Sequence, residues 1–314
     1  MPVSRRILPL VLLLTACGAA TPPISQGPSR AKVSLAFARL LSIEPMHGHY
    51  AAWAVLDGDE AKVVPIGAFL VDGQGGQRGL DGMPRTEWPV AASPQRITEV
   101  FVTQELPGTE ASQPSRQEFL RGTVHGGSAS LAAPIVAESL AGKSGVFLLD
   151  NPVTYKDPTD YNGVWFARLE GRYFPGLDLD ESPVGWMYAG WVILNGTPLR
   201  VGKFAHPADS DDWAGYSGRS GATELINPAG SPMPGEDFIT NLPPGIESGW
   251  NKPALAGATV LVTLESATLA NQEQYPSPIR LFEGTVPASP SRQVMYPFEN
   301  VAATRIPAGT ATVK

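Results

Sequence analysis

The amino-acid sequence predicts an all-β protein, two tandem antiparallel β-sandwich domains behind a lipoprotein signal peptide. The first observation is composition: 33 glycines and 31 prolines in 314 residues exclude a helical bundle or a coiled coil. The second is an internal repeat of short blocks, and the third is an export signal at the N-terminus. Charged residues are only 17% and hydrophobic residues 43%, which is enough apolar material for packed cores.

The repeat indicates a duplication, because the matched blocks keep their order along the chain. The blocks are typical of strands, with β-branched or aromatic residues bounded by turn formers. The matched segments are 37–40 with 166–169, 50–58 with 188–196, 67–69 with 202–204, 102–105 with 262–265, 114–115 with 276–277, and 122–124 with 284–286.

A hairpin is predicted in each copy. Asp57-Gly58 and Asn195-Gly196 favour tight type I′ turns, whose two central residues both need positive φ. Tyr50 and Trp53 are three residues apart, so in a strand they point to opposite faces. We expect Trp53 and its equivalent Trp191 to be buried packing residues.

The N-terminus predicts export and lipid attachment. Arg5 and Arg6 precede a short apolar run, which ends in a Leu-Thr-Ala-Cys segment resembling the bacterial lipobox, with Cys17 as the lipid acceptor. No later run is long enough for a transmembrane helix, and a single cysteine allows no disulfide within the chain. Gly18 favours the outer membrane in a Gram-negative cell. These features divide the chain into a signal peptide (1–16), a lipidated cysteine with a tether (17–31), a first sandwich (32–136), a linker (137–144), a second sandwich (145–290) with a long loop (205–251), and a last strand or a tail (291–314).

The repeated motifs resemble the extracytoplasmic β domain of RskA-type anti-sigma factors and related lipoproteins. The resemblance is carried by the Tyr-x-x-Trp, Gly-x-Phe, Val-Thr-x-Glu and Pro-Ser motifs of both copies, over most of residues 32–290. It implies a β-sandwich outside the membrane that acts in sensing or interaction. A sigma-binding domain and a transmembrane helix are missing from this sequence, so the resemblance does not imply anti-sigma activity, and it supplies no catalytic residues.

The long loop of the second copy is the candidate binding site. It contains Trp213, Tyr216, Trp250, Asp237 and Phe238. Long loops in compact domains are usually functional or disordered, and aromatic residues argue against disorder. Aromatic side chains there either anchor a partner or fold back as a small core of the loop itself.

Residue patterns for catalysis are weak. A P-loop-like segment has Ala137 where the first glycine belongs, and no Gly-x-Ser-x-Gly motif occurs. Glu105 and Glu265 occupy matching strand positions, but one carboxylate per domain is not expected to form an acid–nucleophile pair. We therefore expect no enzyme activity and no cofactor.

Metal sites are also not expected. His47 and His49 lack further zinc ligands nearby. Two acidic runs, at 209–212 and 178–181, carry oxygen ligands suited to calcium but lack the pattern of an EF-hand, and solvated loops are the alternative.

These observations predict a lipid-anchored protein of the cell envelope that acts as a non-enzymatic binding, sensing or structural module. Its partner is expected to be an envelope protein or a polymer. The net charge of −7 and the absence of a basic run exclude nucleic acid as a natural partner. The alternatives are a carbohydrate-binding or hydrolytic module that uses the same aromatics, and a spacer without a binding surface.

Overall fold

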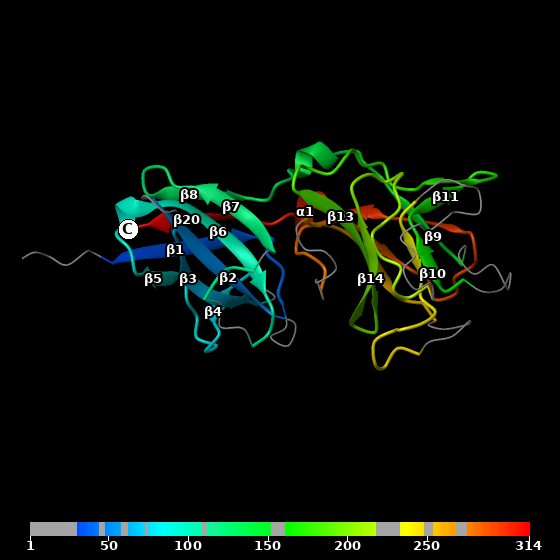
Figure 1. Ribbon diagram of the computed structural model, residues 1–314, viewed down its shortest axis with the longest axis horizontal. Helices are drawn as coiled ribbons and strands as arrows, with labels where there is room; N and C mark the ends of the chain where they lie inside the picture. Colours follow the sequence, from blue (N-terminus) through cyan, green and yellow to red (C-terminus); the bar gives the residue numbers. More distant parts are fainter. Residues whose placement is uncertain are drawn as a thin grey trace, which may run out of the picture.

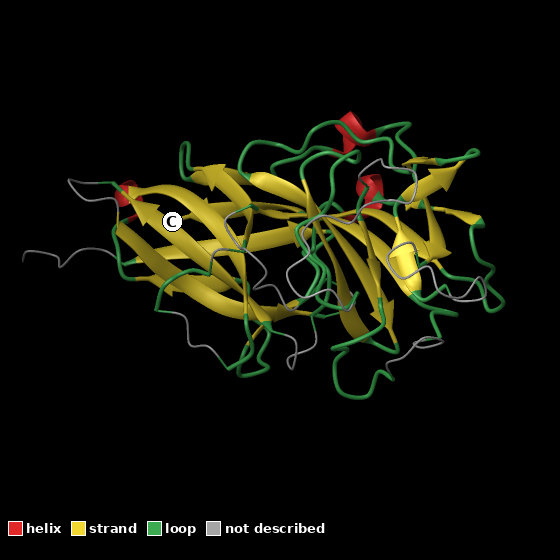
Figure 2. Ribbon diagram, turned by 45° about the vertical axis from the view of Figure 1, so that its right-hand side comes forward, coloured by secondary structure: helices red, strands yellow, loops and turns green. Residues whose placement is uncertain are grey.

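The computed structural model (Figure 1) describes residues 30–43, 48–57, 62–72, 75–108, 112–115, 117–151, 161–217, 233–247, 254–267 and 275–314. Nearly all of its regular structure is antiparallel strand (Figure 2), so the all-β prediction is confirmed. The helices of the described residues are short: α1 (Ala302–Arg305) and the 3₁₀ turns η2 (Pro94–Arg96) and η3 (Ala137–Leu140). No helix of this described part is long and apolar enough to cross a membrane.

The first half is one nine-stranded sheet. It curls on itself, so that Trp88 on one edge strand lies against Gly67 on the strand next to the other edge, where a β-carbon would be 2.1 Å from Trp88 Cε3. The spatial order is β4 (Gln77–Gly79), β3 (Lys62–Val71), β2 (His49–Leu56), β6 (Ile97–Glu105), β7 (Glu118–Thr123), β8 (Ser128–Ala132), β20 (Ala308–Val313), β1 (Ala31–Ala38) and β5 (Glu87–Val90).

The second half has two main sheets and a hairpin. The five-stranded sheet repeats the β3-β2-β6-β7 order of the first half as β14-β13-β16-β17, which agrees with the duplication. Its strands are β14 (Thr197–Phe204), β13 (Trp186–Leu194), β16 (Thr259–Ser266), β17 (Arg280–Thr285) and β19 (Glu299–Asn300). The four-stranded sheet contains β15 (Gly235–Asp237), β10 (Gly163–Trp165), β9 (Val146–Asp150) and β18 (Met295–Pro297), and the hairpin is β11 (Ala167–Leu169) with β12 (Tyr173–Pro175).

The last strand of the chain returns to the first half. β20 pairs with β1 on one side and with β8 on the other. In the second half, β10 pairs with β9, and β9 comes directly before β10 in the chain. The sequence left a strand or a tail open for 291–314, and the structure shows a strand at Ala308–Val313. The second half therefore lies, in sequence, between β8 and β20, and the first sandwich is discontinuous.

The cores of the two halves join. One continuous buried cluster contains Tyr50 and Phe119 of the first half and Tyr188 and Phe298 of the second. Trp53 and Trp191 are buried on the opposite faces of their strands, in small separate clusters. The predicted burial of both tryptophans, and their opposite orientation to the tyrosines, is confirmed.

The two predicted turns differ. Asn195 and Gly196 have φ of 52° and 79°, and Leu194 pairs with Thr197, so the tight type I′ turn is confirmed in the second half. In the first half, Leu56 pairs with Lys62, which leaves five residues between the strands, and the predicted two-residue turn is wrong. The backbone of Asp57 is bound to Arg96 in η2 instead, since its N–H donates to the Arg96 carbonyl oxygen and its own carbonyl accepts from Arg96 Nη2. Residues 58–61 lie outside the described part.

Candidate functional site

The repeated motif residues form a buried hydrogen-bond network in each half. In the first half, Trp53 Nε1 donates to Thr103 Oγ1 at 2.8 Å, and this hydroxyl donates to Glu105 Oε1. The backbone N–H of Ser115 donates to the same carboxylate oxygen at 3.0 Å. One carboxylate thereby ties β6 to the segment that leads into β7, and the indole of β2 joins through the threonine.

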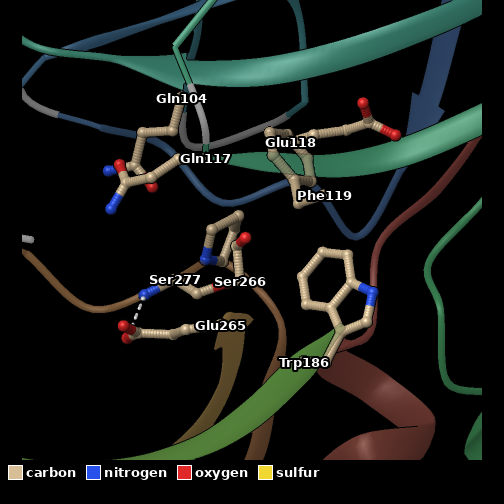
Figure 3. Close-up of a pocket in the computed structure, with 9 residues that line it drawn as sticks. Gln104, Gln117, Glu118, Phe119, Trp186, Glu265, Ser266 and Ser277 are labelled. Atoms are coloured by element: carbon tan, nitrogen blue, oxygen red, sulfur yellow. Dashed lines mark hydrogen bonds between the residues drawn. The ribbon is translucent and has the colours of Figure 1, made fainter. Parts of the chain in front are cut away.

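The second half repeats this network with one change. Trp191 Nε1 donates directly to Glu265 Oε1 at 2.8 Å, and Thr263 Oγ1 donates to the same oxygen at 3.0 Å. The Ser277 N–H completes the set at 3.3 Å (Figure 3). The Val-Thr-x-Glu and Pro-Ser motifs are therefore parts of one structural unit, since they meet at one carboxylate.

Both glutamates are buried, with 5% of Glu105 and 3% of Glu265 exposed. Each is held by hydrogen bonds to its own half, and in each glutamate the Oε1 atom already accepts several donors. This arrangement fits a structural role, because a buried carboxylate without such partners would cost folding free energy.

Different basic side chains lie beside the two glutamates. Lys203 Nζ lies 3.9 Å from Glu265 Oε2, with both side chains buried, and donates to the Ser266 carbonyl oxygen at 3.0 Å. In the first half, His49 pairs in register with Glu105. Burial lowers the pKa of His49, against the opposing effect of the Glu105 charge. The second half thus holds a buried ion pair where the first half places a histidine.

Asp211 fixes the long loop of the second half. Its two carboxylate oxygens each accept a backbone N–H at 2.9 Å, from Trp213 and from Gly235 in β15. Its side chain fits against Gly202 (φ 142°), where a β-carbon would lie 2.1 Å from Asp211 Oδ1. Burial raises the pKa of Asp211 well above its usual range. The loop is therefore bound to both β14 and β15 by one inward-pointing carboxyl.

Aromatic side chains extend this anchor toward the surface. Trp213 contacts Tyr216 edge-on at 5.8 Å between ring centroids, and Tyr216 contacts Phe238 at 5.7 Å. The guanidinium carbon of Arg200 lies 5.3 Å from the Trp213 ring centroid and 5.4 Å from that of Trp191. A buried cation between two indoles is favourable when desolvated. Arg200 therefore connects the loop to the repeated tryptophan of the sheet.

β15 brings two further carboxyl groups inside. Glu236 and Asp237 are both 0% exposed. Asp237 accepts a hydrogen bond from Trp165 Nε1 at 2.8 Å, and Glu236 Oε1 accepts the Asp237 N–H at 3.0 Å. The pKa of Glu236 is raised well above its usual range, first by burial and then by the charges of Asp211 and Asp237.

The predicted site residues are thus only partly brought together at a surface. Phe238 and Asp237 are fully buried and serve the interior of the second half. Trp213 and Tyr216 are half-buried and remain candidates for contact with a partner. Phe238 and Asp237 thus belong to the interior, as in the alternative of an internal core, whereas the half-buried Trp213 and Tyr216 leave the partner-binding possibility open. Trp250 and Cys17 lie outside the described residues.

Another polar cluster was not anticipated. Asp150, 0% exposed, accepts hydrogen bonds from Arg292 Nε at 2.6 Å, from Gln293 Nε2 at 2.8 Å and from the Tyr173 hydroxyl. It fastens the segment before β18 to β9. No sequence signal pairs residues so far apart.

Arg200 is a second residue that the sequence analysis did not single out. It lies opposite Trp191, whereas the first copy has Pro65 opposite Trp53. This difference between the two copies is the signal that could have identified it.

The acidic and histidine residues considered for metals are used otherwise. Asp178 and Asp180 both pair with Lys143 at 3.3 Å. Asp212 accepts the Lys203 N–H at 2.7 Å, and His49 is buried. Among the described residues, no three His, Cys, Asp or Glu side chains are placed to hold a metal ion. His47 lies outside them.

The described part contains a small cavity and an open groove. A cavity of about 10 Å³, lined by polar and apolar side chains, lies between the halves (Figure 3), with room for about one water. It is lined by residues of both halves, including Gln104, Gln117, Trp186 and Ser277. An open groove of about 330 Å³, lined among others by Pro94, Ile97, Val124 and Val313, lies in the first half.

Comparison with protein-family models, with curated proteins and with solved structures found no match for this chain.

Proposed function

We propose that this protein is anchored in the cell envelope by lipid on Cys17 and holds an envelope partner, without catalysis, at the second-half loop around Trp213 and Tyr216. The observation that carries the proposal is the way the loop is fixed. Asp211 binds it through two backbone N–H groups, and Arg200 lies between Trp213 and Trp191. A surface held in place before binding loses less conformational entropy when a partner docks.

The direction of the chain supports this role for the second half. β1 begins at the end of the molecule that is farthest from the second half (Figure 1). A lipid on the segment before β1 would hold this end at the membrane, and the second half would then face away from the lipid. A partner in the envelope would therefore meet the second half first.

The structural contacts of the repeated glutamates support a role without catalysis. Glu105 and Glu265 accept internal hydrogen bonds and tie strands to turns. The cavity beside Glu265 has room for about one water and not for a substrate.

The test uses a photocrosslinking amino acid in the full-length protein in its native envelope. It is placed at exposed Asp209, at the start of the loop, and in a matched variant at exposed Val63 on β3. We expect a crosslinked partner from position 209 and none from position 63, and loss of that product when Trp213→Ala is added. Equal products from both positions, or none, would reject the loop as the binding site. A crosslink to glycan would instead support the carbohydrate-binding alternative.

Lipid attachment is tested separately. Radiolabelled palmitate should be incorporated into the wild-type chain and not into Cys17→Ser, and the variant should leave the membrane fraction. An unlabelled wild-type chain would contradict the anchor.

A further inference from the structure

The first half is connected to the N-terminal tether through β1 and to the second half through β20, and these two strands are neighbours in the sheet. β1 receives the segment that leads from Cys17, and β20 receives the segment that leaves the second half (Figure 1). The strands are antiparallel partners over six residue pairs, from Val33 with Val313 to Ala38 with Ala308. We propose that this strand pair is a mechanical clamp, which carries tension between the membrane and whatever the second half holds. This inference rests on the proposed function, because tension needs an anchor and a partner.

The strand directions decide how a load acts. The N-terminal ends of two antiparallel strands lie at opposite ends of the pair. Tension on the tether pulls β1 by its first residue, Ala31, and tension from the second half pulls β20 by its first residue, Ala308. The two forces are opposed along the strand axis, so the strands are sheared. In shear, all the backbone hydrogen bonds between them share the load, and none can break first and release the rest.

β1 is also held on its other side. It pairs with β5 over four residues, and Leu35 adds two bonds beyond that ladder, since its N–H donates to the Thr86 carbonyl at 3.1 Å and its carbonyl accepts from Gln77 Nε2 at 2.9 Å. Phe37 stacks on Phe69 of β3 at 5.2 Å. To slide out, β1 must therefore break contacts with both neighbours at once.

The connections between the halves, through which tension reaches β20, are held together by hydrogen bonds. Two connections join the halves, 133–145 and 301–307. Asn300 Nδ2 donates to the carbonyl oxygens of Leu140 at 2.7 Å and Lys143 at 3.0 Å, which fastens the second connection to the first. Arg39, just after β1, donates through Nε to the Ile306 carbonyl at 2.8 Å. The joint therefore resists separation before the strands themselves are loaded.

The opposite pulling geometry exists in the same molecule. Lys314 follows β20, and its backbone exchanges two hydrogen bonds of 2.9 Å with Lys32 at the start of β1. A force between Lys314 and the tether would open the pair from this end, one residue pair after another. The clamp should therefore be strong toward the second half and weak toward its own C-terminus.

Single-molecule force spectroscopy on the unlipidated chain from Cys17 to Lys314 tests this. Cys17 is the only native cysteine and serves as one handle. The second handle is Val184→Cys, at a fully exposed residue of the second half, or Lys314→Cys at the C-terminus. We expect the force that ruptures the first half to be at least about twice as high with the second handle at position 184 as with it at position 314. Forced unfolding is governed by the barrier to unfolding, and this barrier is higher when all the hydrogen bonds are loaded together than when they are loaded one after another.

Equal rupture forces for the two handle positions, or a lower force with the handle at position 184, would overturn the clamp. The increase in chain length at rupture shows which half has opened, so an opening of the second half is not counted as rupture of the clamp. The measurement needs neither lipid nor partner. A failed palmitate or crosslinking experiment would thus reject the proposed function and leave the force ratio as a separate result.

Discussion

At the scale of single residues, the buried glutamates are the most sensitive points. Glu265 accepts three donors and lies beside buried Lys203, so its removal leaves an indole N–H and a backbone N–H without their acceptor and the Lys203 ammonium without the carboxylate beside it. Glu265→Ala should lower the free energy of unfolding by about 3 kcal/mol. Urea denaturation measures this, with exposed Glu170→Ala as the control that should change it by less than about 0.5 kcal/mol. A small loss for Glu265→Ala would show that the network is not structural.

The carboxyl groups beneath the loop predict a pH dependence. The pKa values of Asp211 and Glu236 are raised in the folded state, mainly by burial, so the folded protein binds protons more tightly than the unfolded chain. Their contribution to stability is therefore complete below the ordinary pKa of about 4 and falls as the pH rises toward the raised values. The urea midpoint should therefore fall as the pH is raised above about 4.5.

Glu236→Gln, which stays neutral, should make that fall smaller, and Asp209→Asn at an exposed position should not. An unchanged dependence of the urea midpoint on pH in Glu236→Gln would contradict the assignment.

The orientation of these acids could not be predicted from the sequence. Asp211 stands in an acidic run that is typical of a solvated loop, and only the absence of a side chain at Gly202, on the neighbouring strand, lets it turn inward.

At the scale of elements, local signals predicted well and distant pairings did not. The β13–β14 hairpin follows from Asn195-Gly196, because the turn type depends on two adjacent residues. The same reasoning failed after β2, where Arg96, far along the chain, captures the backbone of Asp57. The place of β20 could not be predicted either, since the match of Val33 with Val313 spans almost the whole chain and leaves no local pattern.

β20 offers a prediction of its own. A β-carbon at Gly309 would lie 2.7 Å from Phe37 Cδ1 and 2.9 Å from the Ala36 carbonyl oxygen. Gly309→Val should therefore weaken the contact with β1 and destabilise the first half by about 1–3 kcal/mol. Hydrogen exchange followed by mass spectrometry should show faster exchange in β1 and β8, with β13 and β16 unchanged. Thr310→Val, at the exposed neighbouring residue, is the control. Equal protection in both variants would mean that this close approach is not needed.

At the scale of the whole molecule, the interleaved connectivity joins two repeated units into one body. A simple tandem array would link its domains by one connection, whereas here two connections run side by side and Asn300 binds one to the other. A continuous buried cluster crosses the joint as well. The relative position of the halves should therefore depend on a few polar contacts at the connections as much as on apolar packing.

Asn300→Ala tests this dependence. It removes the donor to the Leu140 and Lys143 carbonyl oxygens and the acceptor for the Ala302 N–H, which leaves backbone groups of the joint without their partners. We expect a broader distribution of distances between spin labels at Val63 in the first half and Val184 in the second, with both halves still folded by circular dichroism. Glu299→Ala, at an exposed neighbour on the same strand, should leave the distribution narrow. If Asn300→Ala is equally narrow, the apolar cluster alone holds the halves, and the load path proposed for the clamp runs through packed side chains instead of the braced connections.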